Sequence, residues 1–241
     1  MLHKTKGIVL KITDYAENSI IAKILTQKFG MQTYMINGVK KPKAKIRLNM
    51  LQPLHLLDMV VYHKPNGNMQ RISDARSEPI LQTIPYDILK SSLVMFINEM
   101  IYKSVKEQHE DEMMFEFIFK SIEWLDAADE GITNFHLIFL SKLTRFLGFY
   151  PDMSTIEKSA FFDLKHGVFT RQQPSHIYLI EEQFIKKWID LFLWPLDDFN
   201  QFKLDQKSRK YFIKKLIDYY TLQIENFGEV KSHLILEEVL E

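Results

Sequence analysis

Cysteine is absent from this 241-residue sequence. Its absence excludes disulfide bonds, cysteine-ligated zinc and a thiol nucleophile. No run of eighteen or more apolar residues occurs, and no long apolar run follows the weakly basic first residues, so we expect neither a membrane span nor a secretory signal. These absences favour a protein of the cytoplasm.

Recognisable catalytic motifs are missing as well. The eight glycines are too scattered for a phosphate-cradling loop, and the eight histidines show neither an H-x-x-x-H spacing nor a carboxylate cluster with metal spacing. A Ser-His-Asp triad assembles in space and need not show in a sequence, but nothing specific points to one. We therefore expect no enzymatic activity and no cofactor, with an unrecognised nucleic-acid hydrolase as one alternative.

The net charge of the chain is zero, but its charges are unevenly distributed. Basic and acidic residues number 31 each, but residues 1–80 hold 13 basic against 5 acidic residues, and residues 81–241 hold 18 against 26. This asymmetry indicates different roles for the two parts of the chain. The basic part is the candidate binder of a polyanion.

The first 80 residues have the pattern of short β-strands. Aliphatic and β-branched runs separated by polar or glycine-containing turns cover residues 7–13, 19–26, 31–36, 54–62 and 69–77. The last two runs flank Asn66-Gly67, a strong hairpin signal. Five short strands in so small a unit predict a closed barrel such as an OB-fold or a small open sheet, and periodicity alone does not choose between them.

Beyond residue 80 the apolar residues recur mostly at helical spacing. Asp87 can cap a helix that begins at Ile88, and further helices are expected over residues 110–125, 133–148, 181–193, 208–227 and 232–240. Residues 149–179 have no single period and indicate an irregular segment or a small hairpin. The predicted fold class is α+β, with a β domain over residues 1–80 and an all-helical domain over residues 81–241.

A lysine-rich loop over residues 40–47 is the clearest local feature. It holds five cations in eight residues, and no acidic residue lies between Glu17 and Asp58. Phosphates are its natural partners because each neutralised phosphate releases counterions, although a merely solvated loop is the alternative. The predicted nucleic-acid contacts are Lys40, Lys41, Lys43, Lys45 and Arg47, with Lys6, Lys11, Arg71 and Arg76 as support.

Two further interpretations concern single side chains. Tyr34, just before the loop, could stack a base, or it could face the barrel core. Lys142 and Arg145 share one face of an otherwise very apolar helix, where they could bind a partner peptide with acidic and hydrophobic residues. The alternative for this pair is ordinary charge that complements a helix C-terminus.

Several segments resemble proteins of the RecO family. Residues 7–19 resemble the family's opening strand, acidic turn and second strand, and residues 25–30 and 37–43 resemble its T-x-x-x-G turn and basic loop. Further similarity is seen at residues 51–54, 146–152 and 227–232, so the resemblance covers essentially the whole chain.

Membership of this family implies an N-terminal OB-fold followed by a helical domain, binding of single- and double-stranded DNA, and annealing of complementary strands. It also implies RecR and the C-terminal tail of single-stranded DNA-binding protein as partners, and a role in loading RecA during repair. A protein-interaction adaptor with incidental DNA binding, acting through Lys142 and Arg145, is the alternative.

One departure from the family pattern concerns zinc. Many RecO proteins carry a four-cysteine zinc site after a Leu-Gly-Phe-x-Pro segment, but residues 153–176 contain no cysteine here. His166 and His176 alone make a poor site. We therefore expect no zinc, and we expect packing of Phe161, Phe162 and Phe169 to hold the segment in place.

Overall fold

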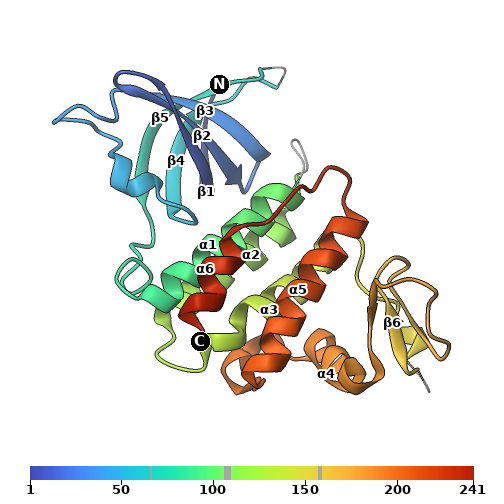
Figure 1. The fold of residues 1–241 in the computed structure, drawn as a ribbon. Helices are drawn as coiled ribbons and strands as arrows, with labels where there is room; N and C mark the ends of the chain where they lie inside the picture. Colours follow the sequence, from blue (N-terminus) through green and yellow to red (C-terminus); the bar gives the residue numbers. More distant parts are fainter. Residues whose placement is uncertain (66, 106–109, 157–158) are drawn as a thin grey trace. The chain divides into compact units, whose positions relative to one another are not determined.

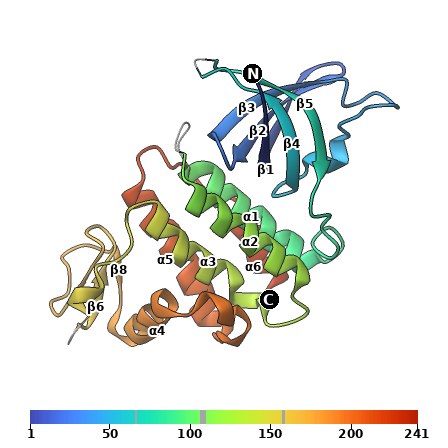
Figure 2. The ribbon, with the colours of Figure 1, turned by 180° about the vertical axis from the view of Figure 1, so that it is seen from behind.

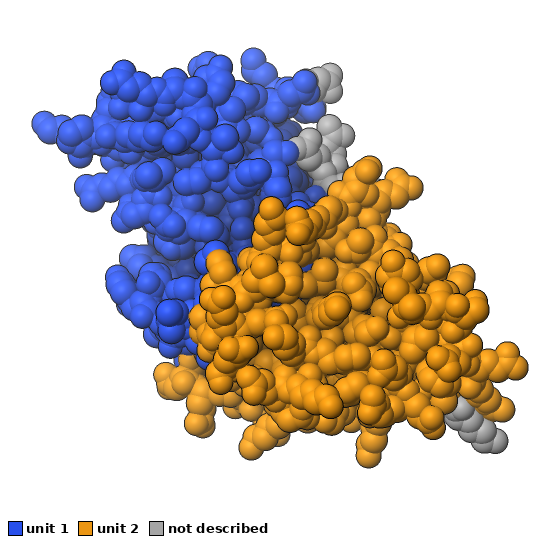
Figure 3. Space-filling view, in the orientation of Figure 1, with its two compact units in different colours: residues 1–127 blue, residues 128–241 orange. Residues whose placement is uncertain are grey.

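The computed structural model describes residues 1–65, 67–105, 110–156 and 159–241. The chain forms two compact units, Met1–Ala127 and Ala128–Glu241, which are coloured separately in Figure 3. By contacts within the chain, the first two helices belong to the same unit as the β-strands, so this division falls at Ala127, later than the boundary predicted at residue 80.

Unit 1 begins with a closed barrel of strand order β1-β2-β3-β5-β4 (Figure 1). Its strands are β1 (Leu2–Ala16), β2 (Ser19–Thr26), β3 (Gly30–Asn37), β4 (Leu56–Tyr62) and β5 (Gln70–Ser77). Strands β3 and β5 close the barrel through a short parallel pairing, while the other pairs are antiparallel. Closure leaves no long sheet edge exposed, and it confirms the OB-like barrel rather than an open sheet.

Strand β1 is longer than its apolar run predicted. Its first residues pair with β4, from Leu2↔Tyr62 onward, and its later residues pair with β2. Irregularities in the β1–β2 register, one of them between Val9 and Lys11, let a single strand curve far enough to do both. The predicted β4–β5 hairpin forms, although Asn66 of its turn lies outside the described residues.

Two helices complete unit 1. Asp87 caps α1 (Ile88–Ser104) as predicted, because its carboxylate accepts a hydrogen bond of 2.9 Å from the Lys90 backbone N–H. The second helix is α2 (Glu112–Ala127). The Asn98 side chain of α1 donates a 2.9 Å hydrogen bond to the Leu10 carbonyl of the barrel. Such contacts explain why these helices group with the strands.

Unit 2 contains four helices in its described part, and Figure 2 shows them from the opposite side. They are α3 (Phe135–Phe146), α4 (Glu182–Leu193), α5 (Gln206–Gln223) and α6 (Ser232–Val239). Short 3₁₀ turns occur at Ile132–Asn134, Met153–Thr155 and Leu196–Gln201, and in unit 1 at Leu48–Leu51. Helix α5 ends before residue 227, because Ile224 is extended and Asn226 adopts a left-handed conformation.

The segment without a clear period forms a small sheet, so this part of the chain is not all helical. The sheet has the order β7-β6-β8, from β6 (Phe161–Asp163), β7 (Val168–Thr170) and β8 (Leu179–Ile180). Phe162 is fully buried, with its ring centroid 4.7 Å from that of Phe169 and 5.8 Å from that of Trp188. Packing by Phe162 and Phe169 is therefore confirmed, whereas Phe161 is only half-buried.

Among the described residues, none of the helices combines the length and the apolar character that crossing a bilayer requires.

Candidate nucleic-acid interface

The lysine-rich loop is anchored to the barrel at both ends. Val39 and Ile46 are only 4% and 8% exposed, and both pack in the barrel core. At the start of the loop Gly38 has φ +75°, a conformation that favours glycine, and its carbonyl accepts a 3.1 Å hydrogen bond from the Lys41 N–H. The anchored ends fix the loop, which projects from the barrel between β3 and the 3₁₀ turn that precedes β4 (Figures 1 and 2).

Three lysines of the loop line a recess in the barrel wall. Lys41, Lys43 and Lys45 share this recess of about 380 Å³ with Arg71 of β5. Arg71 reaches it because the parallel pairing of β3 with β5 sets it opposite Met35, just before the loop. All four cationic residues are exposed, and no acidic residue is among the described residues that line the recess. The recess therefore presents concentrated positive charge to an anion.

Two other predicted contacts already have acidic partners. Lys40 Nζ lies 2.7 Å from an Asp14 carboxylate oxygen, and the Arg76 guanidinium lies 2.9 Å from an Asp58 oxygen. Neither pair is buried, so each remains partly available to solvent. Each carboxylate nevertheless offsets part of the field that its cation would offer a phosphate. Arg47 is exposed at the far end of the loop.

Lys6 and Lys11 lie against the helices of unit 1 and not beside the recess. The Lys6 ammonium is 4.5 Å from the centre of the Phe119 ring on α2, and the Lys11 ammonium is 5.0 Å from that of Tyr102 on α1. These cation–π contacts hold the barrel to its helices. The structure therefore does not unite these two lysines with the loop.

The prediction that Tyr34 stacks a base is wrong in its geometry. The side chain is fully buried in the barrel core, and its burial raises the pKa of the hydroxyl. The Tyr34 hydroxyl has no hydrogen-bond partner among the described residues. A ring inside the barrel cannot present a face to a base.

A half-buried cluster of aromatic rings that the sequence did not reveal lies elsewhere on the barrel. The rings of Phe29 and His63 stack at a centroid distance of 3.9 Å, and His3 meets Phe29 edge-on at 5.3 Å. All three are half-buried. Since the three rings come from turns and strands that are distant in the sequence, no local spacing predicts that they meet.

Lys142 and Arg145 do not form the pair of exposed cations that was predicted. Lys142 is only 7% exposed, and its ammonium donates a 2.5 Å hydrogen bond to the Phe192 carbonyl at the end of α4. Burial, assisted by the nearby Arg145 charge, lowers the pKa of Lys142 to about 8. Arg145 is exposed, but its guanidinium lies 4.1 Å from the centre of the Tyr150 ring. A partner-binding role for Lys142 is incompatible with this burial.

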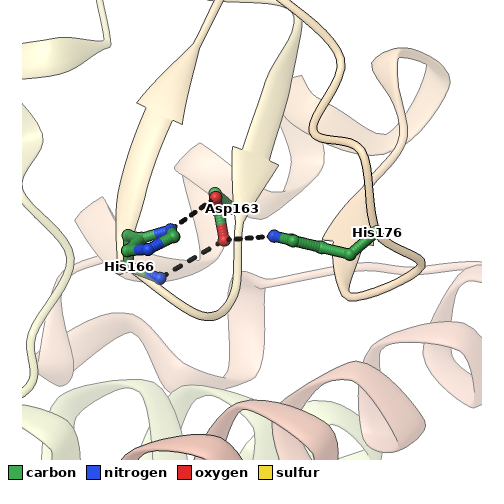
Figure 4. Close-up of side chains that lie close together, drawn as sticks. All are labelled: Asp163, His166 and His176. Atoms are coloured by element: carbon green, nitrogen blue, oxygen red, sulfur yellow. Dashed lines mark hydrogen bonds and ion pairs between the residues drawn. The ribbon is translucent and has the colours of Figure 1, made fainter.

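His166 and His176, the two histidines considered as zinc ligands, meet Asp163 in a polar cluster at the small sheet of unit 2 (Figure 4). One oxygen of Asp163 lies 2.8 Å from His166 Nδ1, and the other lies 3.3 Å from His176 Nε2. The sequence pointed to both histidines but missed Asp163. The pairing of β6 with β8, which brings His176 to this carboxylate, is a tertiary feature.

Comparison with known proteins identifies the family. The profile described as "Recombination protein O N terminal" matches residues 1–79, and the one described as "Recombination protein O C terminal" matches residues 85–181. A protein of Azobacteroides pseudotrichonymphae, named DNA repair protein RecO, is 33% identical over the full length of both chains. The chain belongs to the RecO family. Proteins of the same name from Christiangramia forsetii and Flavobacterium johnsoniae are 35% and 34% identical over 99% and 98% of each chain.

The recess lies within the region that the N-terminal RecO profile matches. The N-terminal profile ends at residue 79, just after β5, so it contains the barrel, the lysine-rich loop and all four recess cations.

Proposed function

We propose that this chain is a recombination mediator of DNA repair that binds single- and double-stranded DNA through the barrel recess. One observation carries the proposal: Lys41, Lys43, Lys45 and Arg71 line a single recess, and none of them has an ion-pair partner among the described residues. The relatives named DNA repair protein RecO support the repair role.

The mechanism is electrostatic. Phosphates that enter the recess release counterions, and the same charge lowers the repulsion between two complementary strands that meet there. Four phosphate contacts on a single strand correspond to a slope of log K against log salt of about −3. The protein would then promote annealing by holding strands together. This mechanism makes or breaks no covalent bond and needs no cofactor.

The wider role is part of the same proposal. The chain would act in the cytoplasm with RecR and the C-terminal tail of single-stranded DNA-binding protein, and help to load RecA. The adaptor alternative relied on Lys142 and Arg145 as exposed cations, and burial of Lys142 removes one of the two. DNA binding is therefore the better supported function.

The proposal is tested by a strand-annealing assay at several salt concentrations, with and without single-stranded DNA-binding protein. The double variant Lys41→Glu/Lys43→Glu is expected to promote annealing at least about tenfold more slowly, because it replaces two cations that would bind phosphates with two anions that repel them. The matched control, Lys203→Glu/Lys207→Glu, makes the same change in net charge at exposed positions of unit 2.

Annealing by the control should stay close to that of the unaltered protein. Equal loss in both double variants would mean that only net charge matters, and no loss in either would remove the recess from the mechanism. Titration with an acidic, hydrophobic peptide separates the adaptor alternative, which predicts peptide binding that survives the loop substitutions.

A further inference from the structure

Three metal-binding side chains converge in the small sheet of unit 2. Asp163 ends β6, His166 lies in the turn to β7, and His176 lies in the segment that leads to β8. One ligand atom from each residue can be chosen so that all three lie within 4.8 Å of one another. Figure 4 shows the carboxylate between the two imidazoles. We propose that these residues form a reversible site for a divalent transition-metal ion such as Zn²⁺.

The distances fit such an ion. Zinc binds imidazole nitrogen and carboxylate oxygen at about 2.0–2.2 Å, so neighbouring ligand atoms of a tetrahedral site lie about 3.3–3.6 Å apart. The 3.3 Å from one Asp163 oxygen to His176 Nε2 has this value, whereas the 2.8 Å from the other oxygen to His166 Nδ1 is the shorter length of a hydrogen bond. An ion would replace the hydrogen bond between His166 and Asp163, and these two ligand atoms would have to separate by roughly half an ångström.

The backbone holds the central ligand in place. Asp163 is 7% exposed, and one of its carboxylate oxygens accepts hydrogen bonds from the N–H groups of Lys165 at 2.8 Å and His166 at 3.3 Å. The Asp163 carbonyl accepts a further 2.9 Å hydrogen bond from Gly167, whose φ of +67° makes the tight turn. The turn thus positions Asp163 and His166 without a metal.

The donor set predicts an open site. Two imidazoles and one carboxylate suit zinc, cobalt or nickel, and three protein ligands leave at least one position for water or another ligand. The His166 side chain is 71% exposed, so solvent reaches the cluster. This chemistry differs from a closed four-cysteine site, which this chain cannot form.

The hydrogen bonds of His176 predict modest affinity. Without metal, its Nε2–H can donate to Asp163. With metal on Nε2 the proton must move to Nδ1, which is buried and has no partner among the described residues. The site should therefore release zinc to a chelator and rebind it, so the proposal departs from the expectation of no zinc.

Metal titration of the full chain tests the site. The protein is stripped with EDTA and titrated with ZnCl₂ by calorimetry and with CoCl₂ by visible absorption, which reports the coordination geometry. One ion per chain is expected, with cobalt bands of a four- or five-coordinate site. His166→Gln and His176→Gln should each weaken binding by at least about tenfold.

The matched control is His233→Gln, a half-buried histidine of the same unit outside the cluster. It should bind zinc as the unaltered protein does. Thermal unfolding gives an independent reading: zinc should raise the Tm of the unaltered protein and of the control, but not that of His176→Gln. Absence of saturable uptake, or equal loss in the control, would overturn the proposal and leave the cluster as a hydrogen-bonded turn.

Discussion

The ammonium of Lys40 lies 2.7 Å from the carboxylate of Asp14, so the first lysine of the basic loop is paired with the end of strand β1. Lys41, Lys43 and Lys45 face the recess and have no such partner among the described residues. The five cations of residues 40–47 are therefore not equivalent, although the sequence shows them as one run.

Removal of the Asp14 charge should strengthen DNA binding. Asp14→Asn frees Lys40 and removes a negative charge near the loop, so affinity at low salt should rise by up to about fivefold, the equivalent of the ~1 kcal/mol upper range for an exposed ion pair. Fluorescence anisotropy with a short labelled single strand measures it, and the gain should shrink at high salt. Weaker binding by Asp14→Asn would show that the carboxylate positions the loop for DNA.

Burial of Lys142 predicts a pH-dependent stability. Its pKa falls from 10.5 to about 8 in the folded state, so between these values the unfolded chain binds more protons than the folded chain. The contribution of Lys142 to stability should therefore rise with pH above 8, by at most about 1.4 kcal/mol per pH unit. Urea unfolding of the unaltered protein and of Lys142→Met at pH 7.5 and 9.5 isolates the contribution of Lys142. If the free energy of unfolding changed equally with pH in both proteins, this prediction would be wrong.

Asp126 should anchor the segment between barrel and helices. Its carboxylate accepts hydrogen bonds of 2.7–2.9 Å from the N–H groups of Gln82, Thr83 and Ile84. Burial alone would raise its pKa, but these bonds and the Thr83 hydroxyl outweigh it and hold the pKa below the ordinary 3.8.

Asp126→Ala should therefore lower the free energy of unfolding by about 1–3 kcal/mol at neutral pH. The stabilisation is complete above the ordinary pKa and is lost as pH falls through the folded pKa, so the gap between variant and unaltered protein should narrow below pH 3.8. Urea titrations at neutral and acidic pH measure this gap. A gap that stays constant with pH would show that the charge of Asp126 is not what holds the segment.

The buried hydroxyl of Tyr34 should be dispensable. Tyr34→Phe removes a polar group that has no partner among the described residues, so stability should stay the same or rise by up to about 1 kcal/mol, with unchanged DNA affinity. Tyr34→Ala should instead lose about 3–5 kcal/mol, because it leaves a cavity in the barrel core. Lower DNA affinity in a fully stable Tyr34→Phe would restore a direct role in binding.

Local patterns predicted what local physics controls. Runs of aliphatic and β-branched residues between turns located the strands, the helical period located the helices, and Asp87 caps the helix that begins at Ile88 as predicted. The charge run marked the loop because like charges must face solvent or an anion. The burial of Tyr34 could also have been predicted, because Tyr34 and the buried Ile36 are two residues apart on β3 and therefore lie on the same face of the strand.

The remaining features depend on contacts between distant residues. Arg71 joins the loop only because β3 and β5 pair in parallel, and Asp163 meets His176 only because β6 pairs with β8. Helix α3 did carry a usable signal: it is apolar on nearly all sides, which is typical of a buried helix and argued against exposure of Lys142.

The salt dependence of DNA affinity tests the central claim most directly. Each phosphate contact on a single strand contributes about 0.7 to the slope of log K against log salt, so Lys41→Ala/Lys43→Ala should flatten the slope by about 1.4. Lys203→Ala/Lys207→Ala in unit 2 should leave it unchanged. If the recess variant kept the full slope, or if both variants flattened it equally, DNA phosphates would not bind in the recess.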